Sequence, residues 1–288
     1  MNDNRSMPAT RRLFIAHAQR PWPPDLVSLL AQLTPTTRLD CPDDCPALPH
    51  ELVLAEALGL PGPPGYTPWA AHATGTWGPP CAWITPCYWH VGVHDLTLTD
   101  PATLMLDEVA SRALLAAMAP YFAQDGITLV YHSPTQWLAQ GAVFDSLRCV
   151  SPARAMGQSV ATWQGIGGSP AQALLRRLQN EMQMLLYTHP LNDTRHAQGL
   201  APVNSFWVSG AGALGAPPAS PAGIDDLGQW DAAAGKRLQA RLGQALPTRL
   251  TLCGQHAAQT WEALPQVWWV KIGRKFSHSR IAVLLDTL

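Results

Sequence analysis

The sequence of 288 residues predicts an α/β protein, with a mixed sheet and flanking helices. The main observation is the order of its segments, because short apolar runs suited to strands alternate with longer segments suited to helices. The second observation is composition: 47% of the residues are hydrophobic and 14% are charged, so a chain of this length can bury a sizeable core. We predict a single α/β domain covering residues 1–288.

The first sixty residues contain one predicted strand and two predicted helices. The apolar run 11–17 suits a strand, and residues 24–33 read as a helix with a proline near its start. Residues 48–60 form the second predicted helix, because Pro49 suits a first turn and Gly59 suits a helix end.

A tryptophan-rich stretch and a long helical region follow. Residues 79–100 favour one or two strands, bent at Pro86 and Gly92. A helical region is predicted from Asp100 to about Phe122, and the apolar run 126–132 after it suits another strand.

The clearest predicted helix begins after Ser169. Ser169 can cap it and Pro170 fits its first position. Its predicted apolar face comprises Leu174, Leu178, Met182 and Leu185. His189 and Pro190 are expected to end it. Beyond it, the sequence predicts strands at 205–210, 249–254 and 267–273, and a helix at 236–245.

Charge and apolar run lengths exclude several classes of function. The formal net charge is −1 and there is no basic stripe, so we expect no nucleic-acid partner. No stretch approaches the roughly 20 apolar residues that cross a bilayer. The apolar run near the N-terminus is too short for a signal-peptide core. Six cysteines spread over the chain do not resemble a disulfide framework, so we expect a cytoplasmic protein that does not enter membranes.

One glycine pattern matches the dinucleotide fingerprint G-x-G-x-x-G after a predicted strand. The glycines are Gly210, Gly212 and Gly215. The fingerprint needs a helix next, whereas Pro217 and Pro218 follow here and cannot occupy a helix interior. We therefore interpret the match as accidental and predict no cofactor.

Two other clusters resemble ligand sites only weakly. The first comprises Cys81, Cys87, His90 and His94. It has no C-x-x-C pair, and in a straight strand His90 and His94 would lie about 13 Å apart, so we predict no metal site. The second comprises Lys271, Arg274, Lys275, His278 and Arg280. These basic residues could hold a phosphate or carboxylate, but a solvated turn is the simpler interpretation.

Residues 187–210 bring several polar side chains together around little apolar surface. We expect His189 to lie at a helix C-terminus and the residues after it to form a tight turn. Two interpretations stay open. Asn192 and Asn204 can bind backbone groups in a purely structural hook, or the turn can present Arg195 and His189 to an anion.

The segment HPLNDTRHAQGLAPVNSFWVSGAG resembles a sequence pattern of archaeal-type cofactor-independent phosphoglycerate mutases, in the alkaline-phosphatase superfamily. The matching positions are His189, Pro190, Asn192, Arg195, Gly199, Asn204, Trp207, Gly210 and Gly212. The resemblance implies a degenerate alkaline-phosphatase-like fold with a part similar to a substrate domain at about 81–210. It also implies substrate-binding roles for His189, Asn192, Arg195 and Asn204.

A longer resemblance covers most of residues 47–285. The segments PHELVLAEALGL, AWITPC, LDEVASRALLAAMAPYFAQDGITL and RRLQNEMQMLLYTHPLNDTRHAQGLAPVNSFWVSG are similar to bacterial proteins of the RpfE-type regulatory family, also described as phosphoglycerate mutase-like. This resemblance implies a regulatory role.

The chain departs from the mutases at their metal ligands. Those enzymes hold two divalent metals with Asp and His residues from several strand ends, and they use a serine nucleophile. Here the first predicted strand is followed by no aspartate until Asp25, and after Asp231 the only aspartate is Asp286. We therefore predict no metal site, assign no catalytic residue, and expect a non-catalytic or degenerate mutase-like protein. Its expected role is regulation or the sensing of a small phosphorylated or carboxylate molecule.

Two alternatives remain, so the sequence leaves open whether the chain is an enzyme. It could be an active metal-dependent phosphoglycerate mutase, or a related phosphoryl-transfer enzyme, with metal ligands such as His90, His94, Asp95 and Asp107. It could also be a protein-interaction module that uses exposed tryptophans between Trp69 and Trp89.

Overall fold

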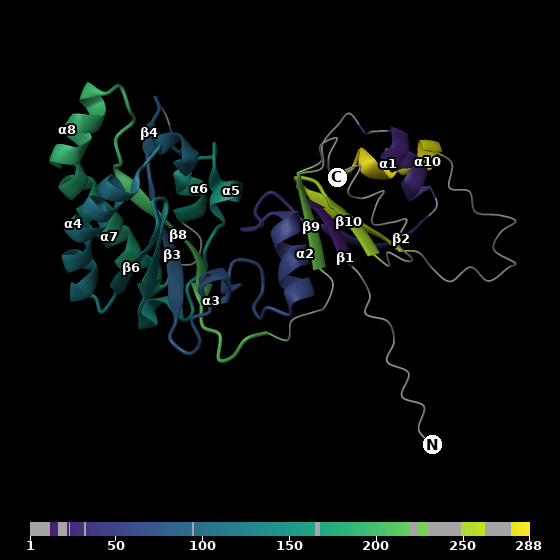
Figure 1. Ribbon diagram of the computed structural model, residues 1–288, viewed down its shortest axis with the longest axis horizontal. Coiled ribbons are helices and arrows are strands. Elements are labelled where there is room, and N and C mark those ends of the chain that lie inside the picture. The colour runs from purple at the N-terminus through teal and green to yellow at the C-terminus, as the bar shows by residue number, and fades with distance from the viewer. Residues whose placement is uncertain are drawn as a thin grey trace, which may run out of the picture. The chain divides into compact units, whose positions relative to one another are not determined.

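The computed structural model of the chain contains two compact units (Figure 1). Unit 1 comprises Met1–Gly59 and Ala219–Leu288, and unit 2 comprises Leu60–Pro218, which lies between those two segments in the chain. The part predicted at about 81–210 falls within unit 2. The residues that the structure describes are 12–16, 22, 24–31, 33–93, 95–164, 168–218, 224–229, 249–262 and 278–288.

Unit 1 is built on a five-stranded mixed sheet. Its strands, in spatial order, are β2 (Thr34–Asp40), β11 (Ala257–Glu262), β10 (Arg249–Cys253), β1 (Arg12–Ala16) and β9 (Ile224–Gln229). β1 pairs in parallel with β10 and β9, whereas β11 is antiparallel to β10 and β2. The predicted mixed sheet is therefore confirmed.

Helices lie against both faces of this sheet. α1 (Pro24–Leu30) and α10 (His278–Leu285) pack on one face, and α2 (Pro49–Leu58) contacts β11 and β1 (Figure 1). The core between the sheet and helices α1 and α10 is apolar. Its buried residues are Leu13, Ile15, Leu26, Leu30, Leu250, Leu252, Trp261, Ile281 and Leu285. As predicted, Pro49 opens α2, and Gly59 ends it in a left-handed conformation that suits glycine.

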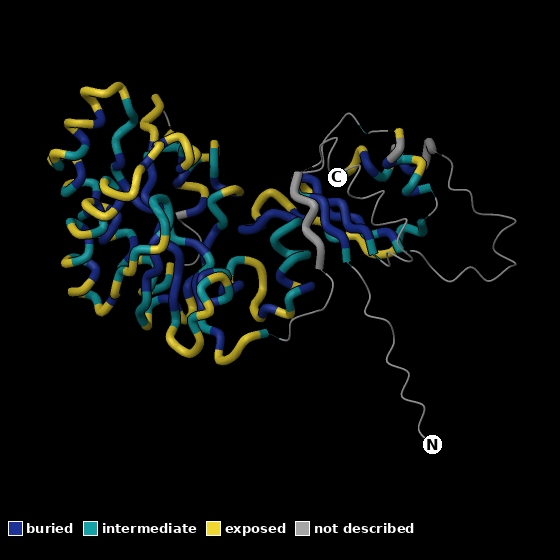
Figure 2. The backbone as a smooth tube through the Cα atoms, in the orientation of Figure 1, coloured by how far each residue is buried: buried dark blue, intermediate teal, exposed yellow. Residues whose placement is uncertain are grey.

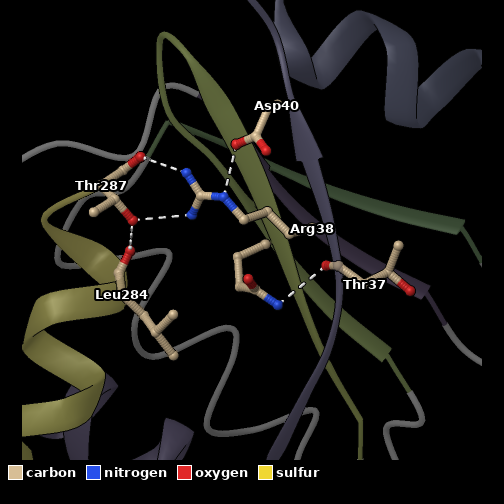
Figure 3. Close-up of polar contacts among 6 residues, drawn as sticks. Thr37, Arg38, Asp40, Leu284 and Thr287 are labelled. Atoms are coloured by element: carbon tan, nitrogen blue, oxygen red, sulfur yellow. Dashed lines mark hydrogen bonds and ion pairs between the residues drawn. The ribbon is translucent and has the colours of Figure 1, made fainter.

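Arg38 on β2 fixes the end of α10 (Figure 3). Its guanidinium donates to the Asp40 carboxylate at 2.7 Å, and to the hydroxyl and carbonyl oxygens of Thr287 at 2.9 and 3.0 Å. The Thr287 hydroxyl donates in turn to the Leu284 carbonyl at 2.8 Å. Arg38 thus holds the residue that follows α10, and the hydroxyl of that residue satisfies one carbonyl of the last helical turn.

Unit 2 is built on a four-stranded antiparallel sheet. Its strands, in spatial order, are β6 (Thr128–Ser133), β7 (Gln136–Gln140), β3 (Cys81–Cys87) and β8 (Ser205–Gly212). β3 continues through Pro86, so the predicted bend there is wrong. β7 pairs only with the first half of β3, from Cys81 to Ile84, and the missing proline N–H is not needed on that side. A separate hairpin follows, formed by β4 (Trp89–Val91) and β5 (Leu96–Leu98).

Two long helices cover one face of the unit 2 sheet. α4 (Glu108–Gln124) packs on β6, and α7 (Pro170–Tyr187) packs on β8 (Figure 1). Ser169 caps α7 as predicted, in a capping box with Gln172. The buried face of α7 includes Leu175 and Leu186, whereas the predicted Leu174 and Leu185 lie half-buried beside it. Figure 2 shows the buried residues concentrated along the strands and the helix sides that face them.

Short helices lie on the other side of the unit 2 sheet. They are α3 (Trp69–Thr74), α5 (Pro152–Ala155) and α6 (Val160–Gln164). The last two pack around Trp89, Trp163 and Trp207 in a second core. Trp83 and Trp89 are buried, whereas Trp77 is 38% exposed. The tryptophan-rich stretch therefore contributes mainly to the interior.

Gly210 and Gly212 have a structural role in β8. Both have positive φ angles, of 61° and 145°, that other residues rarely adopt. A Cβ atom on Gly210 would lie 2.8 Å from Trp69 Cβ, and one on Gly212 would lie 2.9 Å from Pro68 Cβ. The glycine pattern thus lets α3 approach β8, and no helix follows it among the described residues up to 218.

Several predicted elements need correction or lie outside the described residues. The helical region predicted from Asp100 is interrupted: η1 (Pro101–Leu104) is a separate turn of 3₁₀ helix, and Met105 has a φ of +49° before α4 begins. Elements that the sequence did not predict include β2, β7, β9 and β11. The predicted helix 236–245 and strand 267–273 lie outside the described residues. No described helix combines the length and apolar character needed to cross a bilayer.

Candidate functional site

The segment after α7 is a second helix and not the predicted tight turn. α8 spans Pro190–Ala197, and His189 is its N-terminal capping residue. The His189 Nδ1 atom accepts a hydrogen bond from the Leu191 N–H at 3.2 Å. Proline stops α7 because it cannot donate to the preceding turn, yet the same proline suits the first position of a new helix. His189 therefore lies at the positive end of α8, where its ring nitrogen acts as an acceptor.

Asn192 joins the end of α7 to the segment that leads into β8. Its side-chain amide donates to the carbonyls of Leu186 and Val203, each at 2.8 Å, and accepts from the Val203 N–H at 2.9 Å. The residue is buried. These three bonds satisfy backbone groups that no regular strand or helix satisfies here.

Asn204, just before β8, has a similar role and binds the β4–β5 hairpin. Its side chain accepts from the Trp89 N–H at 2.8 Å and donates to the Trp89 carbonyl at 2.9 Å. Its own backbone N–H donates to the Cys87 carbonyl at 3.2 Å. The amide thus pairs with Trp89 as a strand residue would, just before β8 begins.

Arg195 lies inside unit 2 and is only 4% exposed. Its Nε donates to the Ala201 carbonyl at 2.8 Å, and its Nη2 donates to the Leu104 carbonyl at 2.6 Å. Burial lowers the pKa of Arg195 from its ordinary value, and the nearby Asp107 carboxylate raises it in part. The guanidinium therefore connects α8 with η1 through backbone acceptors.

A pocket of about 610 Å³ opens beside these residues. It is bordered by the β4–β5 hairpin, the end of α7, α8 and the residues before β8. Its lining comprises Trp89, Val91, Leu96, Gln183, Leu186, Tyr187, Asn192, Asp193, His196, Pro202 and Asn204. Two predicted site residues, Asn192 and Asn204, thus share one pocket, whereas His189 and Arg195 do not line it. We refer to it as the α8 pocket.

The α8 pocket combines an apolar wall with a few polar groups, as small-molecule sites do, and its size suits such a ligand. The apolar residues include Trp89, Leu96 and Leu186. His196 and Asp193 are exposed at its border and, together with the Tyr187 phenol, are its titratable groups. The sequence had not pointed to Gln183 and Tyr187, although their spacing of four places them on one face of α7.

The residues of the metal-dependent alternative occupy separate local structures. His90 lies on β4, and the Asp107 carboxylate caps α4 by accepting from the Ala110 N–H at 2.7 Å. His94 is outside the described residues. Among the residues that the structure describes, no three His, Cys, Asp or Glu side chains gather as metal ligands would.

All six cysteines lie among the described residues, are buried and form no disulfide. Burial raises the pKa of Cys81 to about 11 and that of Cys149 to about 12. It raises the pKa of Cys87 further, against a smaller lowering by Trp89. Nucleophilic and metal-binding cysteines need a thiolate, so these thiols do not suit such roles.

The predicted basic cluster near the C-terminus lies largely outside the described residues. Lys271, Arg274 and Lys275 are not among them. His278 and Arg280 belong to the first turn of α10. The phosphate-binding interpretation of this cluster stays a prediction.

The fold and the pocket define a mixed α/β protein with a preformed cavity, and comparison with solved structures finds several similar chains, including the following two. One is a cofactor-independent phosphoglycerate mutase from Thermoplasma acidophilum DSM 1728, with 12% identity, a TM-score of 0.37, and coverage of 88% of this chain and 89% of that one. The other is the PH0037 protein from Pyrococcus horikoshii, with 11% identity, a TM-score of 0.44, and coverage of 96% and 97%. No protein-family profile and no curated protein sequence matches the chain.

Proposed function

We propose that this chain is a non-catalytic, phosphoglycerate mutase-like protein that binds a small carboxylate or phosphorylated acid in the α8 pocket. Its role would be regulatory, as the resemblance to the RpfE-type family implies, and its location cytoplasmic. The observation that carries the proposal is that Asn192 and Asn204, both predicted to bind substrate, line one pocket of about 610 Å³.

The hydrogen bonds of the segment support a division of roles among the four predicted residues. Asn192 and Asn204 border the ligand. Arg195 and His189 do not line the pocket, and their hydrogen bonds to backbone groups hold α8 in position. Because Arg195 is buried, an anion could reach its guanidinium only if the packing around it opened, which costs free energy.

The lining favours one kind of acid. His196 is the one basic residue among the described residues of the lining, and Asp193 on the same helix contributes a negative charge. A ligand with several negative charges would be repelled by Asp193, whereas a single carboxylate can bind His196 by a charge-assisted hydrogen bond. The wall that includes Trp89, Leu96 and Leu186 suits an apolar body on that ligand.

Calorimetric titration of the full chain tests this proposal. We expect phenyllactate, an aromatic carboxylate, to bind more tightly than 3-phosphoglycerate. The His196→Ala variant should weaken binding of phenyllactate about tenfold, the size expected for a charge-assisted hydrogen bond. Gln198→Ala is the matched control, because Gln198 is exposed at the end of the same helix and does not line the pocket.

The outcomes separate the parts of the proposal. Equal binding of phenyllactate by the wild-type and His196→Ala chains would show that the pocket assignment is wrong. Manganese-dependent turnover of phosphoglycerate by the purified chain would refute the non-catalytic part and favour the metal-dependent alternative.

A further inference from the structure

A second, smaller hollow of unit 2 carries positive charge and lies against residues other than those of the α8 pocket. It has a volume of about 80 Å³. Its lining comprises Leu147, Arg148, Cys149, Val150, Trp163, Gln172, Leu175, Arg176, Gln179, Trp207 and Val208. None of these residues borders the α8 pocket. We refer to it as the Arg148 hollow.

Two arginines from different segments of the chain line this hollow. Arg148 precedes α5 in the loop after η2 (Ala142–Phe144), and Arg176 lies on α7. Both are half-buried. No acidic residue is among the described residues of the lining, so the lining carries two positive charges and no negative one. Arginine is the side chain best suited to bind an oxyanion through several donors.

Neutral donors accompany these two cations. Gln172 and Gln179 line the hollow from the same face of α7 as Arg176, each about one helical turn from it. Trp163 is 5% exposed, and its indole N–H has no hydrogen-bond partner among the described residues. A buried donor left unsatisfied costs free energy, and an oxyanion beside it offers an acceptor.

The walls of the hollow are held by hydrogen bonds that do not involve the arginines. The Trp207 indole donates to the Val150 carbonyl at 2.8 Å, and the Gln179 amide donates to the Phe206 carbonyl at 3.2 Å. The Cys149 N–H donates to the Gly65 carbonyl at 2.8 Å. The two residues that follow Arg148 are therefore anchored, one to Gly65 and one to β8, and the site is formed before any ligand binds.

We propose that the Arg148 hollow binds a phosphate-sized oxyanion through Arg148 and Arg176. Its volume corresponds to roughly two or three water molecules, well below that of a site for a whole organic ligand. The occupant is therefore inorganic phosphate or the phosphate group of a larger molecule whose remainder stays outside. This inference does not depend on the proposed function of the α8 pocket.

Nuclear magnetic resonance of the tryptophan indole groups in the full chain tests the proposal. Inorganic phosphate, added at constant ionic strength, should shift the Trp163 signal saturably and leave that of Trp261, in unit 1, unchanged. A parallel titration with glycerol 3-phosphate distinguishes the sources, because tighter binding of the ester would identify a phosphomonoester as the occupant. A Trp163 signal that neither compound shifts would overturn the proposal.

Gln172→Glu is the decisive variant. Glutamate at this position preserves the capping box with Ser169, so α7 should fold normally, while the lining gains a negative charge. We expect phosphate affinity to fall at least about tenfold, as for loss of a charge-assisted interaction. Arg148→Gln should have a similar effect, whereas Arg112→Gln, on an exposed arginine of α4, should have none. Unchanged phosphate affinity in Gln172→Glu would contradict the assignment, as would an equal loss in Arg112→Gln.

Discussion

The side-chain amide of Asn204 pairs with both backbone groups of Trp89, 115 residues earlier in the chain. It accepts from the Trp89 N–H at 2.8 Å and donates to the Trp89 carbonyl at 2.9 Å. This pair fixes the β4–β5 hairpin beside the start of β8 and so determines one wall of the α8 pocket. The same wall contains the Trp89 ring, which is buried.

Replacing Asn204 with aspartate should therefore destabilise unit 2. An ionised aspartate still accepts from the Trp89 N–H but cannot donate to its carbonyl, which is left facing an anion. We expect the free energy of unfolding to fall by about 1–3 kcal/mol, measured by urea denaturation. An unfolding midpoint equal to that of the wild-type chain would mean that the pair with Trp89 contributes no stability.

Arg195 should matter for stability and not simply for charge. The Arg195→Ala variant loses two bonds from a buried cation to backbone carbonyls, so we expect a loss of about 3 kcal/mol. The Arg195→Lys variant should recover less than half of it, because one ammonium cannot reproduce the guanidinium fork. Arg112→Ala is the control, since its exposed ion pair with Glu108 and its contact with the Tyr131 ring together contribute about 1 kcal/mol or less. Full rescue by lysine in urea denaturation would refute this account.

Gly210 should tolerate substitution worse than Gly199. Both glycines have positive φ angles, of 61° and 72°, so alanine is strained at either position. A Cβ at Gly210 would also collide with Trp69, whereas one at Gly199 would meet no atom within 4 Å. We expect a loss of about 1 kcal/mol for Gly199→Ala, from the φ angle alone, and at least about 2 kcal/mol for Gly210→Ala. Thermal unfolding of the two variants measures the difference, and equal losses would show that α3 does not constrain β8.

The buried thiol of Cys149 should make the protein less stable in alkali. The folded state holds this proton up to a pKa of about 12, whereas an unfolded thiol releases it near 9.0. Above pH 9 the unfolded state therefore binds fewer protons than the folded state, and stability falls as pH rises, by up to about 1.4 kcal/mol per pH unit for one thiol. Below pH 8 the contribution is constant.

Urea denaturation between pH 8 and 10.5 measures this dependence. The Cys149→Ala variant should show a shallower decline than the wild-type chain, because its other titrating groups are unchanged. Identical slopes for the two chains would indicate that the thiol is not shielded from solvent in the folded state.

The sequence predicted best the elements whose signals are local. The cap at Ser169 with Pro170 defined the start of α7, and the positive φ of Gly59 agrees with its predicted place at a helix end. The strands β2 and β7 were missed for different reasons. β2 has the sequence TPTTRLD and lacks an apolar run, since it lies at the edge of its sheet. β7 is only five residues long and follows β6 after a two-residue connection.

The polar segment after α7 was only partly predictable. A proline gives the same signal whether a chain leaves a helix or begins a new one, so the sequence could not distinguish a turn from α8. The backbone partners of Asn192 and Asn204 were anticipated in the structural interpretation of the segment. The partners of Arg195 were not, because the Leu104 carbonyl lies 91 residues away in the chain and only the tertiary fold brings the two together.

A crystal structure of the full chain with phenyllactate tests the central claim most directly. We expect the carboxylate to lie beside His196 and the aromatic ring to contact Trp89 and Leu96 within the α8 pocket. Phenyllactate bound at another place, or an α8 pocket without phenyllactate at concentrations that saturate the calorimetric signal, would contradict the claim.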